Sequence, residues 1–331
     1  MLNIAIISGG DSGEYEVSVK SAKQVEIHLD RSKFKPFLIS IKGSRWFFLQ
    51  DGKEIPIDKN DFSLSLPEGK IKFDLVFNAI HGSPGEDGKL PGYFDMLGIP
   101  YSSSDVTTSA LTFNKSFCKK VVESWSVNTA RSVHLFRNTE NPLSKIWENV
   151  SLPCFVKPNN GGSSVGMSKV NAPDELEPAI EKAFSEDNEI LVEEFIKGRE
   201  LTCGVLRSEG KILALPVTEI ISKKEFFDFE AKYQDGLAQE VVPADIPGEV
   251  SSECKALSVL LYEKLNCKGV VRFDYILKNN IFFFLEVNTV PGLSEQSIVP
   301  KMARAHGWTM TELFSRLIEE GLKKKAVGSR Q

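Results

Sequence analysis

The chain has 331 residues, of which 41% are hydrophobic and 26% are charged, and its formal net charge is −5. A domain commonly holds about 100–200 residues, so this length predicts two or three domains with sizeable buried cores. The composition excludes disordered, collagen-like and disulfide-scaffold proteins, and no excess of basic residues points to nucleic acid. An anionic substrate would therefore need locally placed cations.

The five cysteines are scattered, and no two of them form a Cys-x-x-Cys pair. This pattern indicates reduced thiols in a cytoplasmic protein rather than a disulfide framework or a structural zinc site. The N-terminus has a short apolar run without a basic segment, so it is predicted to be a first strand and not a signal peptide. No segment reaches the roughly 18 consecutive apolar residues that a membrane span needs.

The first hundred residues alternate strand and helix patterns. Residues 2–8 are apolar and largely β-branched, they end at Gly9 and Gly10, and a helical pattern starts at Glu16. Strand-like runs follow at residues 36–41 and 74–80. This order of elements predicts an open α/β domain.

A polar loop follows these strands, with the sequence His-Gly-Ser-Pro-Gly-Glu-Asp-Gly at residues 81–88. Asp87 can cap the start of the next helix, in which case the loop is a tight turn. His81 could instead orient a carboxylate. The sequence leaves both interpretations open.

The middle of the chain is predicted to start with one helix over residues 107–123 and to continue with a strand that ends at Lys157. Residues 158–166 are rich in Gly, Asn and Ser. A lysine at a strand end followed by such a loop can bind phosphate oxygens through backbone N–H groups. The loop lacks the Walker A pattern, and a flexible hairpin connection is the alternative.

A charged helix is expected next, near residues 174–185. Strands are expected after it, at residues 189–195, 200–207 and 211–220. Glu193 and Glu200 lie where the first of these strands passes into the second, and carboxylates there could meet ribose hydroxyls while backbone groups meet a base edge. The alternative is a solvated edge strand with acidic side chains.

Residues 222–248 are polar, contain aromatic residues and show little periodicity. A stretch of this length without secondary structure inside a compact protein is usually functional, so it is predicted to be a lid. A helix is predicted after it, over residues 250–265.

Two apolar strands, residues 269–277 and 281–288, flank a predicted three-residue turn at residues 278–280. Side chains alternate between the two faces of a strand. With a symmetric three-residue turn, Arg272 lies opposite Glu286, and even-numbered residues of both strands share one face. A bulge would break this parity.

The shared face of this hairpin is expected to carry Arg272, Asp274, Glu286 and Asn288. An unpaired charge on otherwise apolar strands costs several kcal/mol, so each of these charged groups is expected to have a partner or a ligand. Asp274, Glu286 and Asn288 offer hard oxygen ligands suited to Mg²⁺ that also contacts phosphates. The alternative is a buried Arg272–Glu286 salt bridge without a metal.

The last predicted helix has clear boundaries. Thr309 and Glu312 have the spacing of a capping box, and Gly321 is predicted to stop the helix.

Taken together, these motifs resemble the D-alanine–D-alanine ligases of the ATP-grasp superfamily, over nearly the whole chain from Ile4 to about Leu322. Several ordered blocks with matching spacing are far more specific than any one of them. The blocks are residues 9–18, 81–88, 156–166, 230–233 and 286–293.

The resemblance implies an α/β (α+β) fold with the three-domain ATP-grasp architecture. The implied domains are an N-terminal α/β domain (1–103), a central subdomain (104–193) and a C-terminal subdomain (194–331) with the lid 222–248. The implied reaction joins two D-alanines through a D-alanyl phosphate and releases ADP and phosphate, for peptidoglycan precursor synthesis in the cytoplasm. Two Mg²⁺ or Mn²⁺ ions and a homodimer are also implied.

The resemblance also assigns roles to individual residues. ATP is expected to meet Lys115, Lys157, Glu193, Phe195, Ile196, Glu200 and Lys232. The two metal ions are expected at Asp274, Glu286 and Asn288. The D-alanines and the reacting atoms are expected to meet Glu14, His81, Ser163, Tyr233, Arg272, Gly292, Ser297 and Ile298.

Within the last group, Glu14 is expected to hold the ammonium of the first D-alanine, while Ser163 and Tyr233 tie the glycine-rich loop to the lid. Arg272 and the N–H of Gly292 are expected to stabilise the oxyanion. Ser297 is expected, with Ile298, at the carboxylate of the second D-alanine.

The alternatives are a D-alanine–D-lactate ligase, another ATP-grasp carboxylate–amine ligase and, more distantly, an inactive nucleotide-binding scaffold. Tyr233 argues against the D-lactate enzyme, and the retained phosphate and metal groups argue against the scaffold. The chain departs from common family residues without losing any of those groups. The departures are Tyr15, Pro91, Asn114, Phe227 and Phe229.

Overall fold

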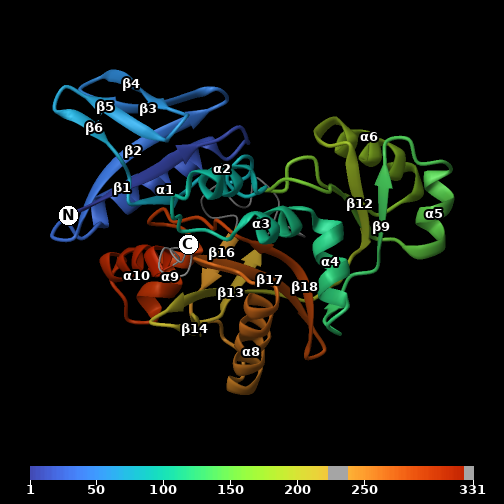
Figure 1. Ribbon diagram of the computed structural model, residues 1–331. Helices are drawn as coiled ribbons and strands as arrows, with labels where there is room; N and C mark the ends of the chain where they lie inside the picture. Colours follow the sequence, from blue (N-terminus) through green and yellow to red (C-terminus); the bar gives the residue numbers. More distant parts are fainter. Residues whose placement is uncertain (223–237, 324–331) are drawn as a thin grey trace.

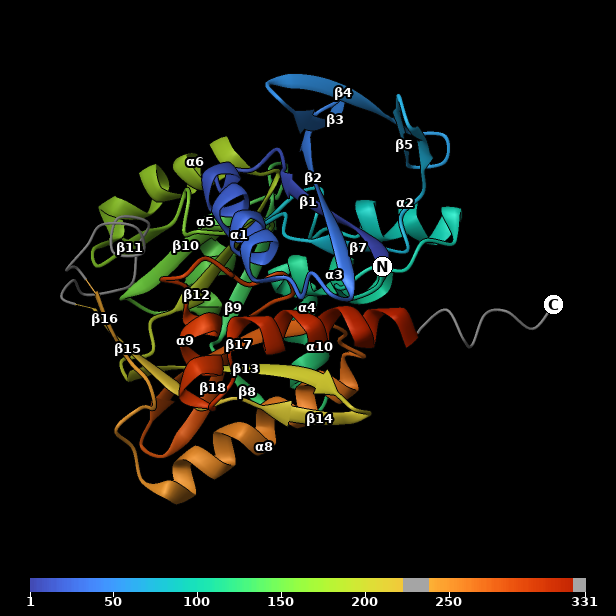
Figure 2. The same ribbon diagram turned by 90° about the vertical axis from the view of Figure 1, so that its left-hand side faces the viewer.

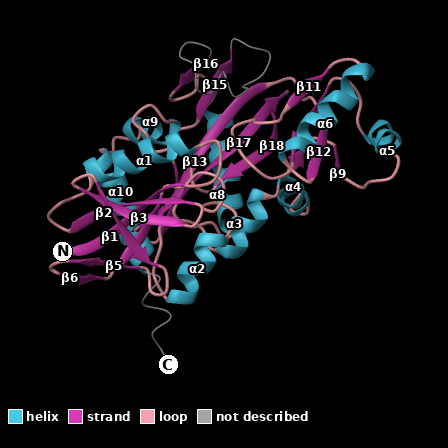
Figure 3. Cartoon of the chain, turned by 90° about the horizontal axis from the view of Figure 1, so that it is seen from above, coloured by secondary structure: helices cyan, strands magenta, loops and turns pink. Residues whose placement is uncertain are grey.

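The computed structural model describes residues 1–222 and 238–323, and these residues form three β-sheets with helices packed on and between them (Figure 1). Seen from above, the N-terminal sheet and the small central sheet lie at opposite ends, and the long strands of the C-terminal sheet run between them (Figure 3). The lid residues Lys232, Tyr233, Phe227 and Phe229 lie outside the described part of the chain.

The N-terminal sheet has the strand order β6-β5-β4-β3-β2-β1-β7. Its strands are β1 (Leu2–Gly9), β2 (Phe34–Lys42), β3 (Arg45–Gln50), β4 (Lys53–Asp58), β5 (Ser63–Leu66), β6 (Gly69–Ile71) and β7 (Leu75–Asn78). The expected strands and the helix α1 (Tyr15–His28) are confirmed, and β1 pairs in parallel with both β2 and β7. The antiparallel strands β3 to β6 were not predicted, because short and largely exposed hairpin strands lack a strong apolar alternation.

The single helix expected over residues 107–123 is wrong. Helix α2 (Lys89–Leu97) is followed by two helices, α3 (Val106–Phe113) and α4 (Lys115–Glu123), which meet at Asn114. Asn114 has an extended backbone, and its side chain accepts a hydrogen bond from the N–H of Phe117. An apolar pattern that runs through an N-cap asparagine hides this break. The break places Lys115 beside the glycine-rich loop, where its N–H donates to the carbonyl of Asn159.

The central sheet is antiparallel, with the order β11-β10-β12-β9. Its strands are β9 (Ser132–Phe136), β10 (Cys154–Pro158), β11 (Ser168–Val170) and β12 (Glu189–Glu194). Helix α5 (Pro142–Asn149), the 3₁₀ turn η1 (Pro173–Glu175) and helix α6 (Leu176–Glu186) accompany it, so the helix expected near 174–185 is confirmed. Their apolar residues form one core with the sheet, which holds β10 and β12 rigid beneath the glycine-rich loop.

The C-terminal sheet has the order β16-β15-β13-β17-β18-β8, and β14 pairs with β13. Its strands are β8 (Asn128–Thr129), β13 (Arg199–Ser208), β14 (Lys211–Ala214), β15 (Thr218–Ser222), β16 (Ala238–Val241), β17 (Val270–Lys278) and β18 (Ile281–Asn288). The strand expected over 211–220 is two strands, β14 and β15, which both pair antiparallel with β13 and are interrupted at residues 215–217, where Pro216 has no N–H to donate. The end of the expected lid contains strand β16, paired with β15. Helix α8 (Gly248–Lys264) packs on this sheet, together with α4.

The hairpin β17–β18 differs from the predicted one in both turn and register. Lys278 pairs with Ile281, so the turn has two residues, Asn279 and Asn280, both with positive φ. Asp274 pairs with Glu286 and Tyr275 with Phe284, which leaves Leu285 as the extra residue of a bulge. The prediction of Arg272 opposite Glu286 is wrong, since Arg272 pairs with Asn288.

The bulge nevertheless produces the shared polar face. Phe282 and Phe284 lie in the core with the odd-numbered residues of β17, whereas beyond the bulge Val287 takes the core side. Glu286 and Asn288 therefore lie on the face of Arg272 and Asp274. A two-residue turn alone would have put them in the core, because one residue of register exchanges the two faces of a strand.

The C-terminal helices join the first sheet to the last one. Helices α9 (Ile298–Ala305) and α10 (Met310–Lys323) lie between β1 and β13 (Figure 2), and the predicted capping box is confirmed by reciprocal hydrogen bonds between Thr309 and Glu312. Phe314 and Leu317 share one core with Ile4 and Phe77. In the described ranges, no helix is long and apolar enough to cross a membrane.

A close backbone contact fixes the C-terminal sheet against residues 102–104. Gly269 has φ +69°, and a Cβ at this position would lie 2.0 Å from the carbonyl oxygen of Ser102. Gly210 has a similar φ of +81°, but no atom lies within 4 Å of a Cβ placed there. Comparing substitutions at the two glycines therefore separates the energetic cost of a side chain at positive φ from the cost of the contact with Ser102.

We predict that Gly269→Ala lowers the free energy of unfolding by at least about 2 kcal/mol more than Gly210→Ala. Gly210→Ala should cost about 1–2 kcal/mol, because an L-residue is strained at positive φ, and Gly269→Ala adds a clash between backbone atoms. Urea unfolding of both variants measures the difference. Equal losses in the free energy of unfolding would show that the backbone at Ser102 shifts away without an energetic cost.

Candidate active site

A cavity of about 1040 Å³ lies where the N-terminal loop, the glycine-rich loop and strands β12, β13, β17 and β18 meet. Most of the predicted site residues line it: Glu14, Lys115, Lys157, Ser163, Glu193, Phe195, Ile196, Glu200, Arg272, Asp274 and Glu286. Five others do not line it and lie elsewhere in the described chain: His81, Asn288, Gly292, Ser297 and Ile298. Most of the residues predicted for the site therefore meet at one cavity, although they are spread over some 270 positions of the chain.

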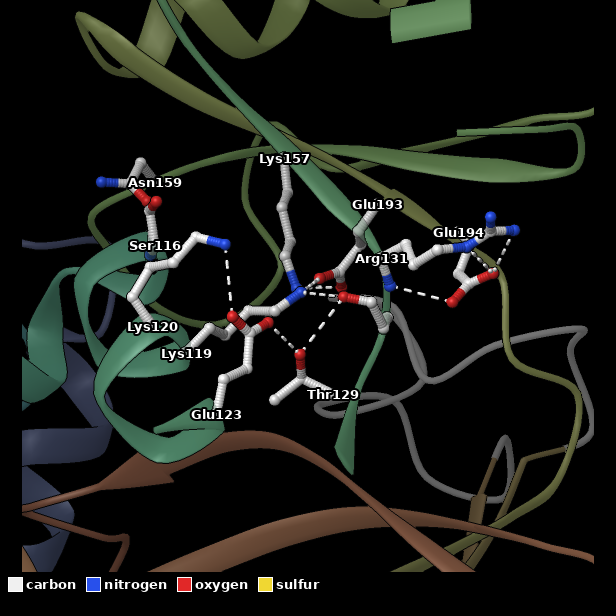
Figure 4. A network of polar contacts seen from close by, with 11 residues as sticks. Ser116, Lys119, Lys120, Glu123, Thr129, Arg131, Lys157, Asn159, Glu193 and Glu194 are labelled. Atoms are coloured by element: carbon white, nitrogen blue, oxygen red, sulfur yellow. Dashed lines mark hydrogen bonds and ion pairs between the residues drawn. The ribbon is translucent and has the colours of Figure 1, made fainter. Parts of the chain in front are cut away.

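Two lysines, one buried and one partly buried, share a carboxylate that lines this cavity (Figure 4). Glu193 on β12 accepts hydrogen bonds from Lys157 on β10 through Oε1 and from Lys119 on α4 through Oε2, the latter at 2.8 Å. The side chains of Lys119 and Glu193 are only 3% and 7% exposed. Glu193 therefore binds lysines in this structure, whereas a solvated edge strand with acidic side chains was one of the alternatives.

The ionisation of Glu193 follows from these neighbours. Burial by itself would raise the pKa of its carboxyl, but Lys119 and Lys157 outweigh burial and hold the pKa at about 2. The carboxylate is accordingly ionised throughout the neutral range, which leaves a pair of ammonium groups around a single negative charge.

The glycine-rich loop is bound from two sides. Ser163 Oγ donates to Oε1 of Glu14 at 2.5 Å, and Lys115 Nζ donates to the carbonyl of Gly161 at 2.5 Å. A Cβ on Gly162 would lie 2.7 Å from Oε2 of Glu14, so a larger residue at this position would displace this carboxylate. The structure brings Glu14 and Ser163 together, as the resemblance implied.

The linker after β12 forms an aromatic part of the wall. The ring of Phe195 lies 5.7 Å from that of Phe155, and Lys169 Nζ lies 4.3 Å from the Phe195 ring centre. The N–H of Phe195 donates to the carbonyl of Pro153. Any backbone contact of Phe195 with a base would therefore use its carbonyl group.

The polar face of the β17–β18 hairpin is centred on Asp274, which is 5% exposed. Arg272 donates to both carboxylate oxygens, from Nε at 2.9 Å and from Nη2 at 2.8 Å. Thr202 Oγ1 donates to Oδ1 at 2.5 Å and Asn288 Nδ2 to Oδ2 at 3.0 Å. These hydrogen bonds occupy about four lone-pair positions, the usual capacity of a carboxylate. The ion pair of Arg272 is formed with Asp274, not with Glu286 as the alternative to a metal site supposed.

His81 lies behind the cavity and binds the segment that follows β18. Ser21 Oγ accepts from the N–H of Leu293 and lies 3.2 Å from Nε2 of His81, while Nδ1 lies 2.6 Å from the carbonyl of Val290. This pattern fits a neutral ring with its proton on Nδ1. Burial lowers the pKa of His81, in agreement with a neutral ring. Its ring contacts are a hydroxyl and a carbonyl, so it does not directly orient a carboxylate.

Gly292 and Ser297 face one another in the same segment. A Cβ on Gly292 would lie 2.8 Å from Ser297 Oγ, and Ser297 Oγ lies 2.7 Å from Ser294 Oγ. Ser297 directly precedes helix α9, which begins at Ile298. The residue expected at the oxyanion, Gly292, thus lies beside Ser297, which is expected at the carboxylate of the second D-alanine.

Glu86 connects this segment to the loop 81–88. Its carboxylate accepts hydrogen bonds at 2.8 Å from the N–H of Gly82 and from the N–H of Val290. Burial, together with the nearby charge of Glu14, raises the pKa of Glu86 to about 7. The loop 81–88 was predicted from the sequence, but no role was predicted for Glu86.

Lys119 and Thr202 were also missed. Lys119 is one helical turn after Lys115, and Thr202 is an ordinary strand residue. Their partners Glu193 and Asp274 are 74 and 72 residues away along the chain. No local sequence pattern marks such contacts. The one available signal was a lysine on the inner face of an amphipathic helix, because a charged residue is rarely buried without a partner.

The comparisons with known families agree with the geometry. A model described as "D-ala D-ala ligase N-terminus" matches residues 3–104, and one described as "D-ala D-ala ligase C-terminus" matches residues 122–319. A D-alanine–D-alanine ligase of Flavobacterium johnsoniae is 45% identical, with 97% of this chain and all of that protein covered. The corresponding protein of Phocaeicola vulgatus is 41% identical, with coverages of 96% and 98%.

Solved structures are similar over the whole chain as well. A D-Ala:D-Ser ligase of Enterococcus faecalis superposes with a TM-score of 0.86 at 33% identity, with 97% of this chain and 99% of that one covered. A D-alanine–D-alanine ligase of Bacillus anthracis complexed with ATP superposes with a TM-score of 0.78 at 30% identity, with 99% of each chain covered.

The raised pKa of Glu86 predicts a pH-dependent stability. A carboxyl whose pKa rises on folding favours the folded state below its ordinary pKa of 4.5, and this advantage is lost as pH rises through about 7. We predict that Glu86→Gln becomes more stable relative to the parent as pH rises across this window, by on the order of 2–3 kcal/mol. The loss of an N–H hydrogen bond in the variant also changes the free energy of unfolding, by an amount that does not vary with pH.

Urea unfolding of parent and variant at several pH values measures this difference. Glu68→Gln is the matched control, because Glu68 is exposed and its variant should keep a constant difference from the parent. A constant difference for Glu86→Gln would mean that Glu86 keeps its ordinary pKa.

Proposed function

The chain belongs to the D-alanine–D-alanine ligase family, and from that premise we propose how its own residues carry out the ligation. The enzyme joins two D-alanines to D-alanyl-D-alanine and converts ATP to ADP and phosphate. The observation that carries the residue assignments is the single cavity in which lysines, acidic groups and a bound glycine-rich loop meet.

ATP is bound along the β10–β12–β13 side of the cavity in this proposal. Lys115 and Lys157 hold the phosphates, and their positions at the start of α4 and on β10 support this role. Glu200 holds the ribose, and Phe195 and Ile196 hold the base, in the cavity wall that also contains Lys169. The lid contributes Lys232.

The first D-alanine lies next to the glycine-rich loop in this proposal. Its ammonium pairs with Glu14, whose carboxylate is held in place by Ser163. Its carboxylate then attacks the γ-phosphoryl group of ATP, and ADP leaves. The D-alanyl phosphate that forms is prone to hydrolysis, so a lid with Tyr233 that excludes water serves the reaction.

The metal ions are proposed at Asp274, Glu286 and Asn288. These are two carboxylates and an amide, an all-oxygen donor set that suits Mg²⁺ or Mn²⁺. Within the described ranges no three His, Cys, Asp or Glu side chains are placed to hold a metal ion, so the proposed set needs the amide of Asn288 as its third ligand. Bound Mg²⁺ would neutralise charge on the phosphates. Asp274 must exchange one of its hydrogen bonds to act as a ligand.

The second D-alanine is proposed to bind with its carboxylate at Ser297 and Ile298, and its amine attacks the acyl carbon. Arg272 and the N–H of Gly292 stabilise the oxyanion that forms, and phosphate leaves. Arg272 is bound to Asp274 in this structure. When Asp274 exchanges that partner, the guanidinium becomes available for the oxyanion.

We further propose the domain division 1–103, 104–193 and 194–331, with a homodimer as the active form in the cytoplasm. The three sheets support three units. Helix α4 and strand β8, within the proposed central unit, pack with the C-terminal sheet, so the unit 104–193 includes a segment that is shared with its neighbour.

The proposed function is tested by phosphate release with ATP and a single co-substrate. We expect rapid release with D-alanine, at least about tenfold slower release with D-lactate and none above background with L-alanine, because both subsites are built around one stereochemistry and an ammonium group. Chromatography of the product identifies the dipeptide. Depsipeptide as the main product from an equal mixture of D-alanine and D-lactate would instead establish a depsipeptide ligase.

The metal proposal predicts that Glu286→Gln lowers kcat by at least about 100-fold, because an amide removes a charge from the ligand set. The affinity for Mg²⁺ in the presence of ATP, measured by calorimetry, should fall as well. Glu253→Gln, an exposed change on α8, is the matched control and should leave both unchanged. Parent-like turnover of Glu286→Gln at saturating Mg²⁺ would remove Glu286 from the metal site.

A further inference from the structure

Lys119 is a buried cation to which the reaction assigns no role. It lies on α4, its side chain is 3% exposed, and it does not line the cavity. Nζ donates to Oε2 of Glu193 and to the carbonyl of Ala130, both at 2.8 Å. A lysine is rarely buried without a specific use, because removing its charge from water is costly.

The partner of Lys119 is the carboxylate that also binds Lys157 (Figure 4). Lys157 and Glu193 both line the cavity, whereas Lys119 does not, and the side chain of Lys157 is 13% exposed against 7% for Glu193. The group of three therefore has Lys119 behind, Glu193 in the middle and Lys157 in front. Its formal charge is one positive unit.

This order affects how strongly Lys157 can attract an anion. With Glu193 as its only neighbour, Lys157 would form a neutral pair, and the carboxylate would compete with any phosphate for its ammonium group. With Lys119 on the other oxygen, the carboxylate is shared and one positive charge remains uncompensated. Charges at this spacing in a buried site interact by several kcal/mol, so the difference is large enough to affect binding.

We propose that Lys119 is a positioning residue of the ATP site, which acts through Glu193 to keep Lys157 oriented and electrostatically available to the triphosphate. The inference rests on the proposed function for the identity of the anion. Lys119 also links α4, which packs on the C-terminal sheet, to β12 of the central sheet. It thereby fixes Lys157 and Lys115 relative to one another.

The alternative is a purely structural role, in which Lys119 only satisfies Glu193 and the carbonyl of Ala130. Loss of Lys119 would then disturb the fold near β12 and weaken all nucleotide contacts alike. The two roles differ in whether the effect depends on phosphate charge and on the charge of Glu193.

The experiment measures calorimetric affinities for ATP and adenosine in the parent and in Lys119→Met. We expect the ATP affinity to fall by about tenfold or more and the adenosine affinity to stay within about twofold. In kinetics, KM for ATP should rise more than kcat falls. An equal loss of affinity for both ligands would overturn the proposal.

The double variant Lys119→Met with Glu193→Gln provides the decisive comparison. Removing the carboxylate releases Lys157 from its competing partner, so the double variant should bind ATP more tightly than Lys119→Met alone. Additive losses would overturn the proposal. Lys119→Gln keeps a donor to Ala130 without the charge, and it replaces Lys119→Met if that variant does not fold, with the same expected outcomes.

A parent enzyme that binds ATP but forms no dipeptide would contradict the proposed function and not this inference. Conversely, dipeptide formation with an unchanged ATP affinity in Lys119→Met would contradict the inference alone.

Discussion

The position of one bulge residue, Leu285, determines the chemistry of the β17–β18 hairpin. Before the bulge the even-numbered residues of β18 belong to the core, and after it they lie on the face of Arg272 and Asp274. A strand has only two faces, so without the extra residue Glu286 would point into the core among Phe273 and Tyr275. The bulge therefore determines both the C-terminal core and the polar face of the site.

The second constraint is the balance of charge in a partly buried cavity. Acidic groups on the hairpin face lie in the same cavity as Lys115 and Lys157. Asp274 is paired with Arg272, and Glu193 is paired with Lys119 and Lys157. Such pairs are costly to bury and costly to break. These ion pairs hold the site in one geometry. Their members can exchange partners when an anionic nucleotide and its cations bind.

The third feature is that the site is assembled across all three sheets. Glu86 and His81 bind the segment after β18 from the N-terminal side, and α10 packs the first sheet on the last. Loop segments that carry Glu14, Gly292 and Ser297 are thus fixed by contacts far from them in sequence. The cavity can therefore hold two amino acids and a nucleotide together, although no single domain surrounds all three.

The sequence by itself determined the local elements and the residue types of the site. Strands β1, β2 and β7 and the capping box of α10 follow from period and caps, which act over a few residues. The residues proposed for phosphates and metal ions were likewise predicted from residue types and their spacing. The break of the helix at Asn114, the bulge at Leu285 and the use of Lys119 were decided only by the tertiary structure. Each depends on what lies across the chain: the glycine-rich loop beside Lys115, the core beneath Phe284, and the carboxylate of Glu193 on another sheet. Contacts of that kind leave no periodic signal, because the partners are set by packing and not by spacing along the chain.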